Sequence, residues 1–243
     1  MKVYIGCSGY SYKNWKNRFY PADLPESGWL EYYAGQFNTV EINNTFYSFP
    51  TEKHLLGWKG QIRGDFKFSI KANRYFTHLK KLKTDDEFLK RLKDFQDTVR
   101  IMGKNLGCIL WQLPANLHQN LSKLEVFCDC LNQQMRHVIE FRHKSWFDPS
   151  VYDILKNKGV GYCMLSAPGE LPEESLATTK TAYLRLHGKT TWYEYDYSAG
   201  ELKKWKQRLD NLRETEMVFI YFNNDKNAYS AQNAKTLQKL IEL

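Results

Sequence analysis

Short apolar runs alternate with longer amphipathic stretches along the whole chain. Eight of the short runs are rich in β-branched and aromatic residues and are bounded by Gly, Pro, Asn or polar clusters, which is typical of strands. Between them, apolar residues recur at steps of three and four, which predicts helices. The predicted strands are residues 3–7, 39–43, 66–71, 107–113, 137–142, 160–165, 182–188 and 218–224. The clearest helical patterns are Phe88, Leu92, Phe95, Val99 and Met102, and Leu202, Trp205, Leu209 and Leu212.

Three helix starts are recognisable from their first residues. Two of them fit capping boxes, in which a Ser or Thr is followed three residues later by Glu. The third fits an N-cap Asp followed by Pro in the first helical turn. The three pairs are Thr84 with Glu87, Ser198 with Glu201, and Asp148 with Pro149.

The order of these elements predicts the fold. Eight strands that alternate with helices over 243 residues match an α/β (β/α)8 barrel of the TIM type, here one domain spanning residues 1–243. A doubly wound open sheet is the alternative. It is disfavoured because neither a GxGxxG nor a Walker loop follows any predicted strand.

The polar residues of the strands share one face, and the apolar residues share the other. Glu41 and Asn43, for example, alternate with Val40 and Ile42. In a barrel the apolar face packs outward on the helices, so the polar face points inward and gathers near the C-terminal strand ends, where barrel active sites lie. The predicted inward set is Ser8, Glu41, Asn43, Lys67, Lys71, Gln112, Glu140, Arg142, Arg185, His187, Tyr221 and Asn223, with Lys67 expected near the barrel bottom.

The inward charges predict a net positive pocket. Charge inside a barrel is costly unless it is paired. Glu41 and Glu140 are the two inward carboxylates, and three cations accompany them at the rim: Lys71, Arg142 and Arg185. Because the planar fork of arginine suits phosphate and carboxylate groups, we expect an anionic small molecule as the ligand. The alternative is an interior network of satisfied ion pairs without chemistry.

Two carboxylates and one imidazole are the candidates for catalysis. Glu140 is the first-choice general acid or base, Glu41 is the second, and His187 is the group expected to titrate nearest neutrality. Trp146 follows the fifth strand directly and is a candidate for stacking on a sugar or base, with simple loop packing as the alternative. The predicted substrate-binding residues are Ser8, Asn43, Lys71, Gln112, Arg142, Trp146, Arg185, Tyr221 and Asn223.

No cofactor and no metal is predicted. Glu41, Glu140 and His187 are potential ligands of one divalent ion, but the neighbouring cations oppose it by repulsion. Five Cys without a CxxC pair favour reduced thiols, and the N-terminus does not resemble a signal peptide. No apolar run approaches the roughly 18 residues of a membrane span. We therefore expect a cytoplasmic protein without a membrane partner, whose oligomeric state the sequence leaves open.

The net charge keeps a second class of function open. There are 35 Lys and Arg against 27 Asp and Glu, which gives 35 − 27 = +8, and 15% of residues are aromatic. Nucleic acid is therefore a possible partner, with basic patches at HLKKLK (78–83) and ELKKWKQRLDNLR (201–213). The alternative is that these are the solvent faces of amphipathic helices. Steep salt dependence would distinguish phosphate-backbone binding from small-molecule binding.

Seven segments resemble the signatures of the domain of unknown function 72 family, the YecE-like proteins. They are GCSGYSYKNW (from Gly6), FNTVEINNTFYSFP (from Phe37), FKFSIKANRYFTH (from Phe66), LGCILWQLP (from Leu106), IEFRHKSWF (from Ile139), YLRLHG (from Tyr183) and YFNN (from Tyr221). The resemblance implies a TIM-type barrel without an established activity. By analogy with the xylose-isomerase and AP-endonuclease barrels, it suggests phosphate or sugar chemistry. The AP-endonuclease set of many His and acidic metal ligands is absent here, which argues against a polynuclear metal centre.

Overall fold

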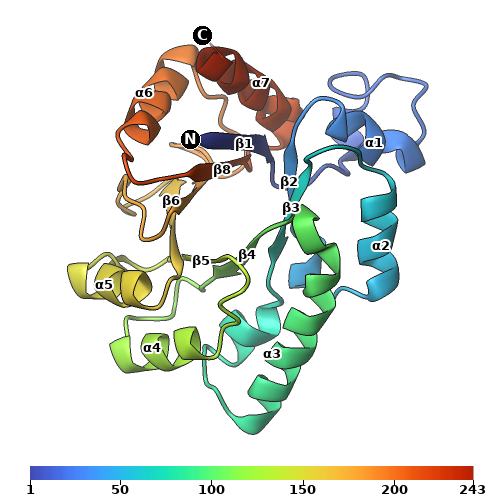
Figure 1. Ribbon diagram of the computed structural model, residues 1–243. Coiled ribbons are helices and arrows are strands. Elements are labelled where there is room, and N and C mark those ends of the chain that lie inside the picture. The colour runs from blue at the N-terminus through green and yellow to red at the C-terminus, as the bar shows by residue number, and fades with distance from the viewer. Residues whose placement is uncertain (243) are drawn as a thin grey trace.

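Eight parallel strands wind into a nearly closed barrel (Figure 1). The computed structural model describes residues 1–242, and the strands are ordered β1-β8-β7-β6-β5-β4-β3-β2. They are β1 (Lys2–Cys7), β2 (Thr39–Ile42), β3 (Lys67–Lys71), β4 (Leu106–Gln112), β5 (His137–Glu140), β6 (Gly161–Ser166), β7 (Thr181–Leu186) and β8 (Met217–Phe222). Every predicted strand is present, and the predicted α/β barrel of the TIM type is confirmed.

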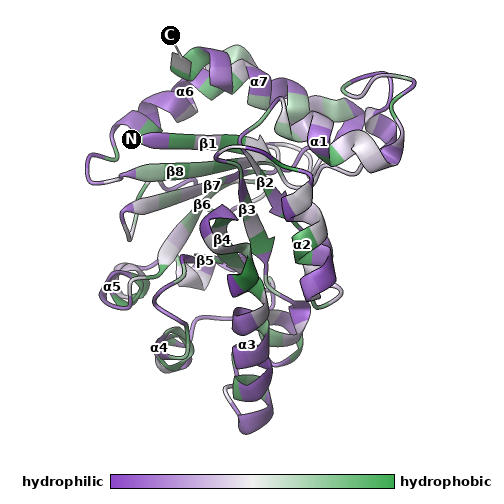
Figure 2. Cartoon of the chain, turned by 45° about the vertical axis from the view of Figure 1, so that its right-hand side comes forward, coloured by the Kyte–Doolittle hydropathy of each residue, from purple (hydrophilic) through white to green (hydrophobic). Residues whose placement is uncertain are grey.

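Helices surround the barrel, as the 3.6-residue periodicity requires. They are α1 (Trp29–Ala34), α2 (Glu52–Gly60), α3 (Asp86–Val99), α4 (Leu121–Asp129), α5 (Pro149–Asn157), α6 (Ala199–Asp210) and α7 (Tyr229–Glu242). Hydrophilic and hydrophobic positions alternate along α3 in Figure 2. Over the described residues, the connection from β6 to β7 (167–180) contains no helix. No helix of the described chain is both long enough and apolar enough to cross a bilayer.

Short helical turns follow several strands at the C-terminal end of the barrel. The turns that follow strands are η1 (Lys13–Trp15), η3 (Asn44–Phe46), η4 (Tyr75–Leu79), η6 (Lys144–Trp146) and η7 (Lys226–Ala228). Two other short turns lie elsewhere: η2 (Glu26–Gly28) precedes α1, and η5 (Arg100–Asn105) precedes β4. Two of them, η3 and η4, carry side chains of the candidate site.

Two of the three predicted helix starts are confirmed. Ser198 and Glu201 form a full capping box before α6. Asp148 is the N-cap of α5, where its side chain accepts a hydrogen bond from the Ser150 N–H and Pro149 is the first helical residue. The prediction of Thr84 as the cap of α3 is wrong by one residue. The N-cap is Asp85, whose carboxylate accepts a hydrogen bond from the Phe88 N–H at 3.0 Å. A negatively charged oxygen is favoured at this position because the N-terminus of a helix carries a partial positive charge.

The barrel interior is layered from an apolar base to a polar mouth. Tyr4 and Phe219 stack at 4.7 Å near the base, within a cluster that also contains Cys108, Leu110, Val138, Cys163, Tyr183 and Tyr221. The alternate residues of the same strands pack outward on the helices. The two-residue period that fills the base with apolar side chains therefore brings Arg185 and His187 toward the mouth on β7.

Side chains bridge the junction between β1 and β2, which share no backbone ladder. The Tyr33 hydroxyl accepts from the Cys7 N–H at 2.6 Å and donates to the Thr39 carbonyl at 3.0 Å. The Asn38 amide makes the same kind of bridge, because its oxygen accepts from Ile5 N–H and its nitrogen donates to the Val3 carbonyl, both at 2.9 Å. A single hydroxyl and a single amide thus replace the missing ladder bonds.

The Tyr33→Phe variant should be less stable by about 1–3 kcal/mol, because it leaves a buried N–H and a buried carbonyl without a partner. The measurement is urea unfolding beside the wild type. Tyr47→Phe is the matched control, since Tyr47 is 72% exposed. A Tyr33→Phe stability within about 0.5 kcal/mol of the control would contradict the bridge.

Candidate functional site

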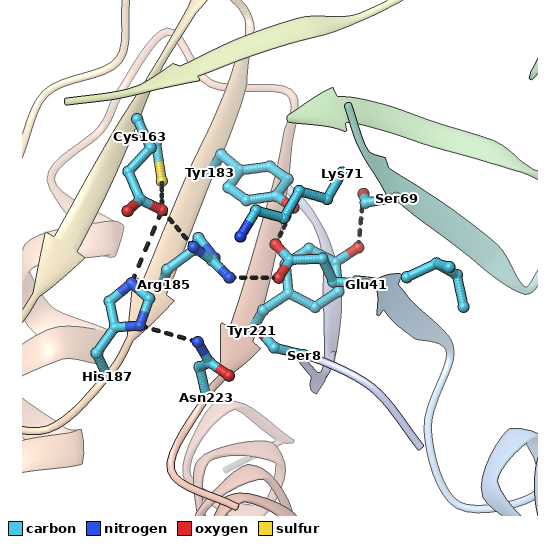
Figure 3. Close-up of polar contacts among 12 residues, drawn as sticks. Ser8, Glu41, Ser69, Lys71, Cys163, Tyr183, Arg185, His187, Tyr221 and Asn223 are labelled. Carbon is cyan, nitrogen blue, oxygen red and sulfur yellow. Dashed lines mark hydrogen bonds and ion pairs between the residues drawn. The ribbon is translucent and has the colours of Figure 1, made fainter. Parts of the chain in front are cut away.

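Arg185 is the central residue of the barrel mouth. It comes from β7 and reaches two carboxylates on other strands: Nη2 lies 2.7 Å from Glu41 Oε1 and Nη1 lies 2.5 Å from Glu140 Oε2 (Figure 3). Glu41 and Glu140 are fully buried, and Arg185 is 1% exposed. Both carboxylates predicted to point inward do so, and they meet the same guanidinium.

The second oxygen of each carboxylate also has a donor. The Tyr183 hydroxyl donates to Glu41 Oε2 at 2.6 Å, and Arg142 Nε donates to Glu140 Oε1. Burial alone would raise the pKa of Glu140, but the Arg142 and Arg185 guanidinium groups hold that pKa well below its usual range. Glu140 is therefore ionised near neutrality, and its two oxygens are both engaged by protein donors.

His187 lies beside this network and does not titrate near neutrality. Its Nε2 is 3.0 Å from Arg142 Nη2, and its Nδ1 is 3.0 Å from Asn223 Nδ2. Burial, together with the charges of Arg142 and Arg185, lowers the pKa of His187 to about 3. The imidazole is thus neutral at pH 7, which corrects the expectation of a neutral-range titration.

Lys71, at the end of β3, is the group that titrates near neutrality. Burial, and then the charge of Arg185, lower the pKa of its amine to about 7. Its Nζ lies 4.2 Å from the ring centre of Phe46. Among the hydrogen bonds and ion pairs of residues 1–242, none involves Nζ of Lys71.

A cavity of about 590 Å³ opens at the mouth beside this network. It is lined by Arg74, His78, Leu79, Lys81, Gln112, Pro114, Ala115, Asn116, Arg142, Leu171 and Trp192. Gln112 and Arg142 belong to the predicted set. Arg74 and Trp192 were missed because they lie in the irregular segments after β3 and β7, where strand phase carries no information. Their position directly after a strand end was the available signal. Lys81 was noted only as part of the basic segment 78–83 and not as a residue of the pocket.

Several buried polar atoms near the strand ends have no hydrogen-bond partner among residues 1–242. Those that belong to the predicted set are Ser8 Oγ, Asn43 Oδ1 and Arg185 Nε, from the ends of β1 and β2 and from β7. Buried polar groups are normally paired, so unpaired ones at a barrel mouth indicate donors and acceptors available to a ligand or water. Ser8 and Asn43 thus remain candidates for substrate binding.

Trp146 and Tyr221 occupy other positions than predicted, whereas Lys67 lies at the barrel bottom, where it was expected. Trp146 is 1% exposed, stacks on Phe141 at 5.0 Å and donates to the Leu117 carbonyl, so it packs outside the barrel and does not line the cavity. The Tyr221 hydroxyl is engaged by Thr39 and Ser69 below the mouth. Lys67 lies at the barrel bottom, where it pairs with Asp65 at 2.6 Å. Trp146 was misplaced because the chain turns outward after Arg142.

No group of three or more His, Cys, Asp or Glu within residues 1–242 is arranged to hold a metal ion. The carboxylates of Glu41 and Glu140, the potential ligands, instead accept hydrogen bonds from arginine and tyrosine side chains. All five cysteines are free thiols.

A family model, described as a protein of unknown function DUF72, matches residues 4–243. The chain belongs to the DUF72 family. A crystal structure of a DUF72 family protein from Thermotoga maritima has a TM-score of 0.90 and 28% identity, with both chains covered completely. One from Enterococcus faecalis has a TM-score of 0.84 at 18% identity, covering 99% of this chain and 96% of that chain.

Two curated relatives are also similar over long segments. The UPF0759 protein YunF of Bacillus subtilis is 24% identical over 99% of this chain and 95% of its own length. The UPF0759 protein YecE of Escherichia coli is 28% identical over 65% of this chain and 55% of its own length. The DUF72 resemblance noted in the sequence is therefore confirmed over nearly the whole chain.

The Glu140→Gln variant should lose about 3–5 kcal/mol of stability at pH 7, because it leaves two buried guanidinium groups with one carboxylate fewer. A depressed pKa adds stability above the unfolded value of about 4.3 and loses it as the pH falls. The difference between wild type and variant should therefore shrink below about pH 4.

Urea unfolding at pH 7 and at lower pH values measures both effects. Glu31→Gln, on the exposed side of α1, is the matched control and should be nearly neutral. A Glu140→Gln variant as stable as the wild type would show that Glu140 is not required to hold the arginines.

Proposed function

We propose that the cavity at the barrel mouth binds an anionic small molecule of phosphorylated, sugar-like or nucleotide-like character, and that the protein is an enzyme acting on it. One observation carries this proposal: the cavity is lined by Arg74, Lys81 and Arg142, and by no Asp or Glu. A concave site with cations and amides converging on it is the expected form of an anion site.

The unpaired charge of the cavity supports the proposal. Arg74 and Lys81 form no ion pair among the described residues, in contrast to Lys80, which pairs with Asp85 at 3.0 Å. Burial, and then the charges of Lys71, Arg74, Arg142 and Lys81, lower the pKa of His78 to about 4, so His78 is neutral at pH 7 and free to offer a ring nitrogen to a ligand. An anion entering the cavity would neutralise charge that the protein leaves uncompensated.

The remaining lining residues suggest how a ligand would be oriented. Gln112 and Asn116 offer amides, and the Trp192 ring lies under the Arg142 guanidinium at 4.6 Å. Trp192 takes the stacking role expected of Trp146 from the sequence.

General acid–base catalysis by Glu140 or Glu41 needs a proton or a free lone pair, and the arginine contacts limit both. We therefore assign these two carboxylates to positioning, because they hold Arg142 and Arg185 at the mouth. In this scheme His187 and Asn223 orient Arg142 as neutral groups.

Arg74→Gln and Lys81→Gln should each weaken binding of inorganic pyrophosphate about tenfold or more, because a hydrogen bond to a charged group contributes about 1.5–3 kcal/mol. Isothermal titration calorimetry with pyrophosphate measures the change. Arg18→Gln and Lys90→Gln are matched controls, since both residues are exposed and outside the cavity, and they should bind like the wild type.

Pyrophosphate affinity that is equal in all four variants would contradict the site.

Titrations with an oligonucleotide in place of pyrophosphate test nucleic acid, the second candidate, which is favoured by the basic segment 78–83 at the rim of this cavity. Oligonucleotide binding that falls about 10³-fold or more between 50 and 200 mM salt would identify phosphate-backbone recognition. The α6 patch is less suited to it, because Lys206 pairs with Asp210 and Arg208 pairs with Glu173.

A further inference from the structure

The charges at the mouth do not balance. Two carboxylates, Glu41 and Glu140, face three basic side chains, Arg142, Arg185 and Lys71. Arginine keeps its proton at any ordinary pH, whereas lysine loses one readily when it is buried. Arg142 and Arg185 donate to three of the four carboxylate oxygens, and Tyr183 donates to the fourth. Lys71 is therefore the one basic side chain of this cluster that pairs with neither carboxylate.

Burial and the charges of Arg185 and Arg142 lower the pKa of Lys71, and they outweigh Glu140 and Glu41, which raise it. Nζ lies 4.2 Å from the ring centre of Phe46 in η3, a cation–π contact that stabilises the protonated amine, so the lowered pKa arises in spite of this ring. The same ring contacts His78 of η4 at 4.9 Å. Figure 3 shows the side chain of Lys71 extending toward Arg185 and Glu41. The charges of these five groups balance when Lys71 is neutral.

Lys71 is not among the residues that line the cavity, but it neighbours two residues that are, Arg142 and His78. It is paired in register with Leu110 of β4, and the cavity-lining Gln112 is two residues further along that strand. His78, which shares the Phe46 contact with Lys71, lines the cavity as well. A ligand that is held by Arg74, Lys81 and Arg142 and extends past Arg142 would therefore come next to an amine that makes no hydrogen bond or ion pair among the described residues.

We propose that Lys71 is a nucleophilic amine that forms an imine with the carbonyl carbon of an anionic ligand bound in this cavity. The inference rests on the proposed anion site and names the substrate class as phosphorylated or carboxylated aldehydes and ketones. Unpaired lysines beside other cations are activated in this way in enzymes that use covalent amine catalysis.

The step balances without an oxidant or reductant. The Nζ lone pair forms an N–C bond with the carbonyl carbon, and the C=O π pair moves to oxygen, which takes up a proton as nitrogen releases one. The hydroxyl of the resulting carbinolamine then takes up a proton from solvent and leaves as water while the nitrogen lone pair forms the C=N bond. The iminium so formed returns a proton to solvent to give the neutral imine. The imine withdraws electrons from the adjacent carbon, which is the purpose of such a linkage.

The first test measures the amine without any ligand. Reductive methylation of the wild-type protein with formaldehyde and cyanoborohydride, followed by peptide mapping, gives the rate at each lysine as a function of pH. At pH 7 an amine that titrates near 7 is about 10³ times more deprotonated than an ordinary lysine near 10.4. Even with restricted access, Lys71 should react at least about tenfold faster than the exposed Lys90. A slower or equal rate would overturn the proposal.

The second test uses pyridoxal 5′-phosphate as a phosphorylated aldehyde probe, with borohydride to trap the imine. Lys71 should be the principal labelled residue at pH 7, pyrophosphate should suppress the labelling, and Lys71→Arg should abolish it. Phosphate-free pyridoxal is the matched probe and should label Lys71 at least tenfold less.

The outcomes separate this proposal from the function on which it rests. Probe that binds and is displaced by pyrophosphate, yet leaves Lys71 unlabelled, would overturn the nucleophile and keep the anion site. Lys71 labelled equally in the wild type and in Arg74→Gln or Lys81→Gln would keep the nucleophile and overturn the anion site. The methylation rates and the displacement of the probe by pyrophosphate are measured on the wild-type protein, so these two results do not depend on the stability of a Lys71 variant.

Discussion

The barrel mouth depends on one buried guanidinium that holds two carboxylates from different strands. Arg185 joins β7 to β2 through Glu41 and to β5 through Glu140, across the interior of the barrel. A buried ion pair of this kind compensates the desolvation of its charges only if the remaining lone pairs and protons are satisfied. Tyr183 and Arg142 meet most of that demand, which is why the network extends outward to His187 and Asn223.

The same constraint decides the electrostatics of the site. Because Arg142 and Arg185 use both carboxylates, Arg74, Lys81 and Lys71 have no counter-ion from the interior among the described residues. The lining of the cavity therefore contains cations and no acidic residue of the described chain.

Strand phase predicted the fold and the core of the network, because a two-residue period applies wherever a strand is buried on both faces. It placed Glu41, Glu140 and Arg185 inside the barrel, as the structure has them. It could not predict which carboxylate oxygen meets which arginine, and so the low pKa of Glu140 was not foreseen. Irregular segments carry no such period, which explains why Trp146 was chosen in place of Trp192.

The central claim is that Glu140 is the counter-ion of Arg185, and a double-mutant cycle tests it most directly. The measurement is the free energy of unfolding of Glu140→Gln, Arg185→Met and the double variant at pH 7. The account predicts that the double variant is more stable than the sum of the single losses implies, with a coupling energy of about 0.5–3 kcal/mol. Additive losses would contradict the account, because they would show that the two charges do not stabilise one another.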